Sequence, residues 1–398
     1  MSEPRYRVLA IASHPVQYMA PLLGRMALHP QLDLSVAYCT LRGAQPSHDP
    51  DFNTTVKWDI PLLEGYPWQE ILNRGSGTES FWGLYNPGLS NLIRSSKFDA
   101  ILCYLSYLCA SFWISYFAAR RSGAAFIFGT DASSMISRTG GTWKIRLKSL
   151  YWPMLFSLAD QVIVPSSASR DLLVSLRVPA ERITLTPYSV DNDWWVAESQ
   201  KIDREAVRAS WGATPRTSVI LFCAKLQAWK RPLDLLRAFV QAKLSDVLLV
   251  YAGEGAQRQE LEEESKTLGV REQVRFLGFM NQSQLPAVYT AADVMILPSE
   301  YEPFGVVVNE ASCCGCPVVA SDRVGAAKDL IAPVNPGLIY SCGDIQALST
   351  LLNELCRGNG RLRELGRAAK DRMASWSPQE TVAGTVAALG AALRRRQR

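Results

Sequence analysis

The sequence has no large excess of charge of either sign and no framework of paired cysteines. Its 398 residues carry a formal net charge of +5, which is too small to indicate a nucleic-acid partner but suits an anionic substrate or membrane surface. Nine cysteines, an odd number scattered along the chain, argue against disulfides and for a reducing compartment. We therefore expect a cytoplasmic protein, at the inner face of the cytoplasmic membrane if it contacts lipid. The run 313–316 has a CxxC spacing without a second ligand pair, so we interpret it as buried side chains at a tight turn.

The sequence also lacks a long uninterrupted apolar run and any low-complexity segment, and we expect no secretory signal. Residues 1–7 are polar, and the apolar run after them is short and contains His14 and Pro15. Residues 100–119 have the length of a spanning helix, but three serines interrupt them. We expect a buried strand followed by a helix there, in preference to a membrane span.

Short apolar runs alternate with helical segments along the whole chain. Residues 5–12 and 33–38 are expected strands with a helix at 21–28 between them, an order that favours parallel pairing and a right-handed crossover. The length suits two or three domains, and 48% hydrophobic residues can build their cores. We predict an α/β protein with two doubly wound, Rossmann-like domains, 1–195 and 196–375, followed by a terminal segment, 376–398.

Two glutamates frame a stretch near residue 300. A strand ends at Pro298, a helix is expected at 304–314, and so Glu302 precedes the helix while Glu310 lies about two turns along it. Free backbone N–H groups at a helix start favour an anion, and a glycine permits close approach of a ligand. The N–H groups expected to do this belong to Phe304, Gly305 and Val306. The alternative is a helix with two solvated glutamates.

This stretch resembles the E-x7-E signature of the retaining glycosyltransferases of family 4, the glycosyl transferases group 1. Ser321-Asp322-Arg323-Val324-Gly325 extends the resemblance, since the family often has a similar S-D-x-x-G run. The resemblance implies that Glu302 contacts the donor sugar and that Glu310 holds the ribose hydroxyls of the nucleotide. It further implies the GT-B architecture, in which an N-terminal acceptor-side domain and a C-terminal donor-binding domain face each other across a cleft. In related enzymes a terminal helix, here 376–398, crosses back onto the N-terminal domain.

Two lysines add positive charge to the same half of the chain. Lys225 ends an expected strand at 218–224, and Lys230 precedes an expected helix at 233–243, so both reach one rim and suit a diphosphate. The family usually has arginine and then lysine here, so Lys225 offers a point charge in place of a bidentate fork. Solvated side chains are the alternative. The resemblance also assigns donor contacts to Gly253 and Glu254 of a G-x-G turn, and a base pocket to Phe279 and Met280.

The N-terminal half has its own candidates. His14 opens an H-P-x-Q-Y run that looks like one bacterial branch of the family, and it follows a strand whose carboxyl end should border a crevice. Asp131 also follows a strand, where that branch often has R-G-D-S; the aspartate matches here and the arginine does not. Each residue has two interpretations. Both could contact a sugar or the acceptor; alternatively, His14 only caps a turn and Asp131 is the N-cap of the next helix.

Aromatic and basic segments complete the pattern. Residues 42–91 are irregular and rich in aromatics, which suit either acceptor sugars or a satellite hydrophobic cluster; these are Trp58, Tyr66, Trp68, Phe81, Trp82 and Tyr85. Residues 142–158 mix Lys and Arg with aromatics, as an ordinary surface helix or as one lying on an anionic membrane. The basic end 394–398 is either a lipid contact or a solvated terminus.

We therefore expect an enzyme that transfers a sugar from a nucleotide diphosphate sugar to an acceptor hydroxyl with retention of configuration. The acceptor would be a glycan or lipid-linked glycan in bacterial surface polysaccharide or glycoconjugate assembly. Candidates for catalysis are Glu302, Lys230, Asp131 and His14. We expect no cofactor, no metal, since no DxD motif stands in a suitable place, and no nucleic-acid partner. A nucleotide-sugar epimerase and a non-catalytic subunit of the same fold remain alternatives.

Overall fold

A computed structural model describes residues 5–49, 51–52, 54–78, 80–136, 142–357 and 360–397, without the side chains of His48 and Thr142. The chain divides into two compact units. The first contains Met1–Ser47, Ile60–Ser189 and Pro378–Arg398, and the second contains His48–Asp59 and Val190–Ser377. The division after Ser189 lies six residues before the domain boundary predicted from the sequence. Nothing in the sequence had indicated that residues 48–59 belong to the second unit.

The first unit is built on a seven-stranded, wholly parallel sheet of order β5-β2-β1-β6-β7-β8-β9. Its strands are β1 (Tyr6–Ala12), β2 (Leu32–Tyr38), β5 (Trp68–Glu70), β6 (Ala100–Cys103), β7 (Ala125–Gly129), β8 (Gln161–Val164) and β9 (Ile183–Leu185). The central strands are buried on both faces, as the continuous apolar runs predicted.

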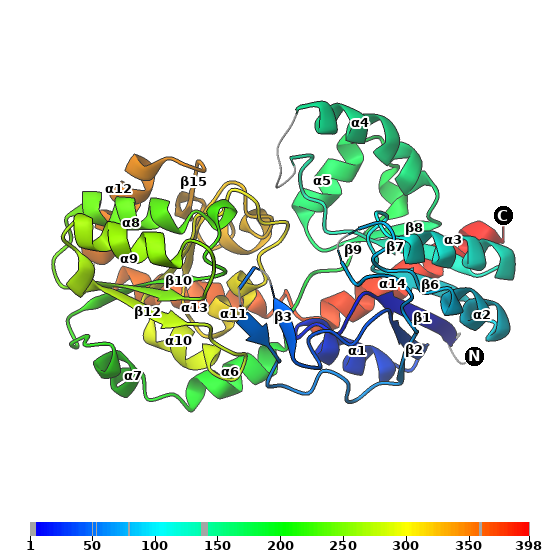
Figure 1. Ribbon diagram of the computed structural model, residues 1–398, viewed down its shortest axis with the longest axis horizontal. Helices are drawn as coiled ribbons and strands as arrows, with labels where there is room; N and C mark the ends of the chain where they lie inside the picture. Colours follow the sequence, from blue (N-terminus) through cyan, green and yellow to red (C-terminus); the bar gives the residue numbers. More distant parts are fainter. Residues whose placement is uncertain are drawn as a thin grey trace. The chain divides into compact units, whose positions relative to one another are not determined.

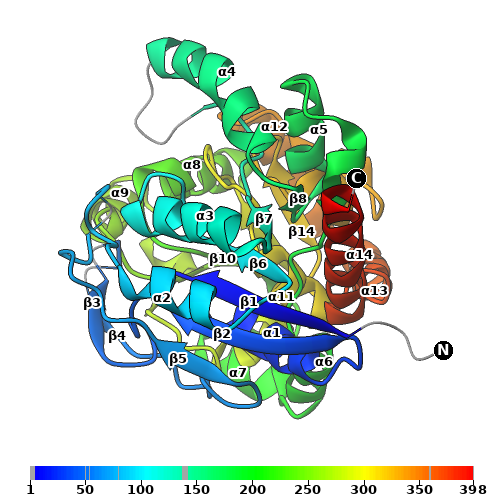
Figure 2. The same ribbon diagram turned by 90° about the vertical axis from the view of Figure 1, so that its right-hand side faces the viewer.

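Helices cover both faces of this sheet (Figure 2). Helix α1 (Met19–Ala27) packs with α14 (Pro378–Arg396), which also contacts β7, β8 and β9. On the other side, one core joins α2 (Gly88–Ser95), α3 (Ala110–Ser122), α4 (Thr142–Ser157) and α5 (Ser167–Ser175). The prediction of a strand and then a helix for 100–119 is confirmed by β6 and α3. None of the helices in the described residues is both long enough and apolar enough to cross a bilayer.

The second unit has a six-stranded parallel sheet of order β12-β11-β10-β13-β14-β15. Its strands are β10 (Ser218–Cys223), β11 (Val247–Ala252), β12 (Val274–Gly278), β13 (Val294–Leu297), β14 (Val318–Ser321) and β15 (Ile339–Tyr340). One face carries α8 (Pro232–Ala242), α9 (Arg258–Thr267) and α12 (Ile345–Arg357). The other carries α6 (Asn192–Gln200), α7 (Arg204–Ser210), α10 (Leu285–Ala291), α11 (Val307–Cys313) and α13 (Arg361–Met373) (Figure 1).

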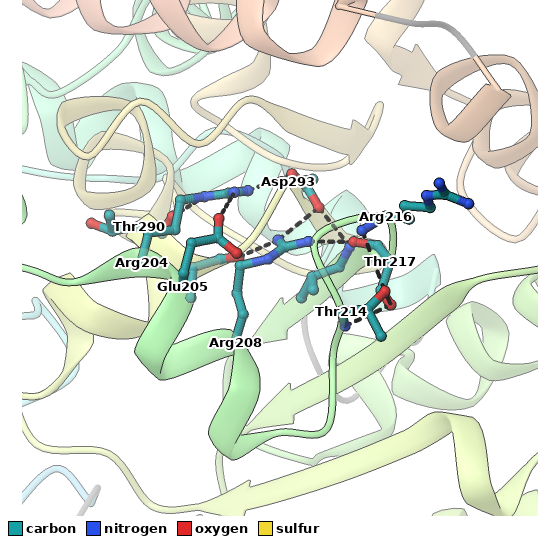
Figure 3. A network of polar contacts seen from close by, with 10 residues as sticks. Arg204, Glu205, Arg208, Thr214, Arg216, Thr217, Thr290 and Asp293 are labelled. Atoms are coloured by element: carbon teal, nitrogen blue, oxygen red, sulfur yellow. Dashed lines mark hydrogen bonds and ion pairs between the residues drawn. The ribbon is translucent and has the colours of Figure 1, made fainter.

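A buried polar network fixes α7 to the start of β13 (Figure 3). The guanidinium of Arg208 donates to Asp293 Oδ2 at 3.0 Å, to the carbonyl of Ala291 at 2.9 Å and to the carbonyl of Thr217. Asp293 also accepts from Arg204 at 2.5 Å. The side chain of Arg208 is only 3% exposed, so its charge depends on these partners for compensation.

Candidate active site

The second sheet reverses its strand order between β10 and β13. From β10 the chain proceeds outward to β11 and β12, and it then returns to add β13, β14 and β15 on the other side. In open parallel sheets, ligands bind beyond the carboxyl ends of the strands at such a reversal. A ligand is therefore expected beside the residues that follow β10 and β13, and these include the predicted Lys225, Lys230 and Glu302.

An ion pair joins the two sides of this reversal. Lys230 Nζ, in the short 3-10 turn Ala228–Lys230 after β10, contacts Glu302 Oε2, in the loop after β13. The side chains are 15% and 13% exposed, so Glu302 is not the solvated surface group of the alternative interpretation. The predicted S-D-x-x-G run holds the loop: Glu302 forms a bridge with Val324, and its carbonyl accepts from Gly325 N at 3.0 Å.

The helix after Glu302 starts later than predicted. Helix α11 begins at Val307, three residues beyond the predicted Phe304, because Gly305 has a φ of +98°, which no right-handed helix contains. A Cβ on residue 305 would lie 3.1 Å from Glu302 Cγ and 3.3 Å from Val324 Cγ1. Gly305 thus allows the loop to fold closely around Glu302, and Phe304 and Val306 are loop and N-cap residues of a short helix.

Glu310 lies inside the second unit, on α11. The residue is 5% exposed, and its Oε2 accepts a hydrogen bond from the hydroxyl of Tyr289 at 2.8 Å. Burial raises the pKa of Glu310 to about 7, and the hydrogen bond from Tyr289 opposes part of that rise. Here too the solvated-glutamate alternative is wrong. Tyr289 was not predicted as part of the site, because it stands 21 positions earlier on another helix.

The turn after β11 approaches the end of β10 closely. Gly253 has a φ of +145°, and a Cβ there would come within 2.0 Å of the carbonyl oxygen of Ala224. The carbonyl of Glu254 accepts from Leu226 N at 2.8 Å, and the Glu254 carboxylate pairs with Arg258 at 3.1 Å. The G-x-G turn therefore supports the backbone next to Lys225.

Residues 48–59 reach the predicted donor residues. Lys225 Nζ lies 3.2 Å from Asp49 Oδ1 and 3.1 Å from Asp51 Oδ2. The ring of Phe279, in the segment after β12 that also contains Met280, packs edge-on against Phe52, with centroids 5.0 Å apart. Sequence reasoning missed these contacts, since more than 170 residues separate the partners; the only signal was the acidic and aromatic composition of the segment.

In the first unit, His14 follows β1 and Asp131 follows β7. His14 Nδ1 lies 2.9 Å from Ser13 Oγ. The interpretation of Asp131 as a helix N-cap is wrong for the described residues, because α4, the helix that follows it, begins only at Thr142. Asp131 acts on two tyrosines through its charge: burial raises the pKa of the Tyr18 and Tyr188 phenols, and the Asp131 carboxylate raises it further. Those two rings pack with centroids 5.4 Å apart.

The aromatic residues of 42–91 divide into separate environments. Phe81, Trp82 and Tyr85 line a cavity of about 430 Å³ together with α3 residues that include Trp113 and Arg121. Tyr66 is buried, with its hydroxyl 2.7 Å from that of Tyr38, so it belongs to the core. Trp68 lies in β5, and its Nε1 donates to the carbonyl of Leu63 at 2.8 Å. Trp58 belongs to the second unit, where its ring packs near Phe279.

Within the described residues, the cysteines belong to no metal-ligand set. All nine are free thiols, and Cys313 and Cys316 are buried, as the sequence predicted for a tight turn. Burial raises the pKa of the Cys313 thiol to about 12, which disfavours the thiolate that would bind a metal. In the part of the chain that the structure describes, no group of three or more His, Cys, Asp or Glu side chains is arranged to hold a metal ion.

Comparisons with known proteins bear on the family of the chain. The model of the family described as glycosyl transferases group 1 matches residues 203–372, and that of the glycosyl transferase 4-like domain matches residues 18–189. The D-inositol 3-phosphate glycosyltransferase of Mycolicibacterium gilvum is 30% identical over 304 residues, covering 73% of this chain and 67% of that protein.

Two further matches cover different shares of the chain. The D-inositol 3-phosphate glycosyltransferase of Mycobacterium sp. (strain KMS) is 35% identical over 242 residues, which cover 59% of this chain and only about half, 53%, of that protein. Anabaena Alr3699/HepE, solved in complex with UDP and glucose, is 18% identical, with a TM-score of 0.71 over 96% of this chain and 98% of that one. That likeness concerns the fold, which is GT-B.

Proposed function

Since the chain belongs to the glycosyl transferases group 1 family and is a glycosyltransferase, we propose that its donor is a nucleotide diphosphate sugar bound at the β10/β13 reversal. The observation that carries this proposal is the pairing of Lys230 with Glu302 at that point, with Lys225 on the same strand end. Anabaena Alr3699/HepE, which shares the fold, was solved with UDP and glucose, and this supports the donor class.

The proposed reaction joins the acceptor oxygen to the anomeric carbon and breaks the bond from that carbon to the diphosphate. The nucleoside diphosphate departs with the electron pair, so negative charge grows on its oxygens. Lys225 and Lys230 would stabilise that charge as fixed cations, without a metal ion. Glu302 would orient the donor sugar through its hydroxyls, and Glu310 would hold the ribose. We propose that the product keeps the configuration of the donor, as the family resemblance implies.

The acceptor is proposed to contact the first unit. Asp131 and His14 follow two strands of its sheet and are the candidates for accepting a hydrogen bond or proton from the acceptor hydroxyl. The aromatic cavity lined by Trp82 and Trp113 would suit a sugar ring or an apolar chain. A glycan or lipid-linked glycan of a bacterial surface polysaccharide or glycoconjugate is therefore the proposed acceptor class.

We also propose that α4 contacts an anionic membrane surface. Four large apolar side chains at helical spacing are between 50% and 73% exposed: Trp143, Leu147, Leu150 and Met154. The helix contains no acidic residue, and Arg146 is exposed beside the stripe. Lys148 should add little to the attraction for an anionic membrane, because its Nζ donates to the carbonyl of Met135 at 3.2 Å and burial lowers its pKa. An exposed apolar stripe with basic neighbours is typical of interfacial helices.

A donor screen tests the proposal. The protein is heated with each of a panel of nucleotide diphosphate sugars, and a donor at 100 times its dissociation constant should add roughly 2.7 kcal/mol of stability. The donor found is then incubated with glycan acceptors in EDTA, and the product is examined by NMR. We expect transfer with the donor's anomeric configuration. Consumption of the donor without an acceptor, with proton exchange at the sugar, would indicate the epimerase instead, and absence of any donor binding would indicate the non-catalytic subunit.

A further inference from the structure

An acidic segment lies across the carboxyl ends of three neighbouring strands in the second unit. We call it the acidic strap and define it as the described residues of 48–59, namely 48–49, 51–52 and 54–59. It comes from the N-terminal part of the sequence but belongs to the second unit, where part of it pairs as β3 (Ser47–Asp49) and β4 (Thr54–Val56). Its contacts fall after β10 and after β12, on either side of β11.

One end of the acidic strap surrounds Lys225 with negative charge. Lys225 Nζ is 3.2 Å from both carboxylate oxygens of Asp49 and 3.1 Å from Asp51 Oδ2, and it lies 4.7 Å from the centre of the Phe52 ring. The neighbouring Gln227 donates from Nε2 to the carbonyl of Asp51 at 2.5 Å. These contacts leave the lysine side chain only 27% exposed.

The other end is anchored after β12. Asn281 Nδ2 donates to the carbonyl of Lys57 at 2.8 Å, and Asp59 N donates to Asn281 Oδ1 at 3.3 Å. Asp59 accepts from the backbone N–H of Ser283 at 3.2 Å and also from its hydroxyl. Between the two ends, the aromatic rings of the strap pack on Phe279, so the strap covers that residue as well as Lys225.

Like a diphosphate, the two carboxylates place two anionic groups against one cation. Burial alone would raise the pKa of Asp49, but the positive charge of Lys225 and the N–H groups of Phe52 and Asp51 outweigh it and hold that pKa below its ordinary value. Asp49 therefore stays ionised next to Lys225 at neutral pH. The single positive charge of Lys225 cannot compensate these carboxylates and a ligand anion at the same time. A ligand anion can therefore reach Lys225 only by replacing the carboxylates.

We infer that Asp49 and Asp51 occupy the diphosphate position at Lys225, so that the acidic strap must release this lysine before a donor binds. This inference rests on the proposed function and deepens it: the strap sets the affinity for the donor's diphosphate. A site that is open for only a fraction of the time binds its ligand more weakly by that fraction. Ion pairs between partly exposed side chains are weak, so the expected penalty is roughly three- to ten-fold in affinity.

The test uses inorganic pyrophosphate, because it needs no assumption about the base or the sugar. Its dissociation constant is measured by calorimetry for the unaltered protein, for Asp49→Asn with Asp51→Asn, and for Glu64→Gln as an exposed acidic control outside the strap. We expect binding to tighten about three- to ten-fold in the double variant and to stay unchanged in the control. Lys225→Ala should abolish the difference.

Equal or weaker pyrophosphate binding by the double variant would overturn the inference, because the carboxylates would then not compete with the anion. Failure of pyrophosphate to bind any of the proteins would overturn it as well, since Lys225 would not be an anion site. The proposed function fails in a different experiment, the donor screen and transfer assay. Hydrogen exchange gives a second readout: amides of residues 54–59 should exchange faster when pyrophosphate is bound.

Discussion

The hydroxyl of Tyr289 donates to the carboxylate of Glu310 across 2.8 Å, inside the second unit. Both side chains are buried, and the thiol of Cys223 lies 3.3 Å from the same hydroxyl. An acid in such surroundings binds its proton more tightly than it does in water, which is why the pKa of Glu310 rises to about 7. The ionised form of Glu310 is therefore populated only near and above neutral pH.

This relationship predicts a pH-dependent stability. The pKa of Glu310 rises from 4.5 to about 7 on folding. The contribution of this group to the unfolding free energy is therefore fully present below pH 4.5 and is lost as the pH increases through 7. Glutamine does not ionise, so Glu310→Gln does not lose this stability as the pH rises. Between pH 4.5 and 8 the unfolding free energy of the variant should therefore increase by about 3 kcal/mol relative to that of the natural protein. Denaturant unfolding at several pH values measures the difference, with Glu64→Gln as control. A difference that does not change with pH would contradict the burial argument.

The network of Figure 3 predicts a variant that changes stability without changing the site. Asp293→Ala removes the carboxylate shared by Arg204 and Arg208, and it leaves the buried guanidinium of Arg208 without that partner. We expect a loss of about 3 kcal/mol or more in unfolding free energy. Glu205→Ala, at a side chain that is 61% exposed, should cost less than about 1 kcal/mol. Pyrophosphate affinity should be the same in both folded variants; a stable Asp293→Ala protein would show that the network is dispensable.

A pair of glycine variants compares a crowded position with an open one. Gly253 and Gly269 both have positive φ, but a Cβ at 253 would lie 2.0 Å from Ala224 O while a Cβ at 269 meets nothing within 4 Å. Gly269→Ala should therefore cost only about 1–2 kcal/mol for its backbone conformation. Gly253→Ala should cost more and should weaken donor binding, because the end of β10 beside Lys225 must move. Thermal unfolding and donor titration compare them, and equal behaviour would remove the packing argument.

The exposed stripe of α4 predicts binding to anionic vesicles. Replacing Leu147, Leu150 and Met154 with serine should reduce co-sedimentation with phosphatidylglycerol vesicles by on the order of ten-fold or more, because three buried apolar groups are lost from the lipid contact. A matched control replaces three scattered, exposed leucines of the same unit, Leu28, Leu72 and Leu108, with serine. Equal binding of the two triple variants would place the membrane contact elsewhere or nowhere.

The sequence predicted the architecture well because the signals were local. Apolar runs of strand length gave the central strands, and their alternation with helices gave parallel sheets, which β1, β2 and β6 confirm. The ends of helices were predicted less accurately. No residue before Gly305 indicates that the backbone has a positive φ there, so the start of α11 was predicted three residues too early.

The environment of the predicted site residues could not be read from the sequence. The predicted strand and helix put Lys225 and Lys230 at one rim of the sheet, and the family resemblance added Glu302, but neither showed that Lys230 and Glu302 form a pair. Asp49 and Tyr289 were not predicted, because each meets its partner through a fold that joins distant segments: Asp49 is 176 positions from Lys225. Local pattern carries no information about such pairs, whose geometry depends on the crossovers of the sheet.

Transfer activity of Lys230→Ala and Glu302→Ala, measured with the donor and acceptor found by screening, tests the central claim most directly. Lys266→Ala, at an exposed lysine on α9, serves as the control. If these two residues act on the diphosphate and the donor sugar, each substitution should lower kcat/KM by about 100-fold or more while circular dichroism shows an intact fold. Full activity in either folded variant would contradict the account.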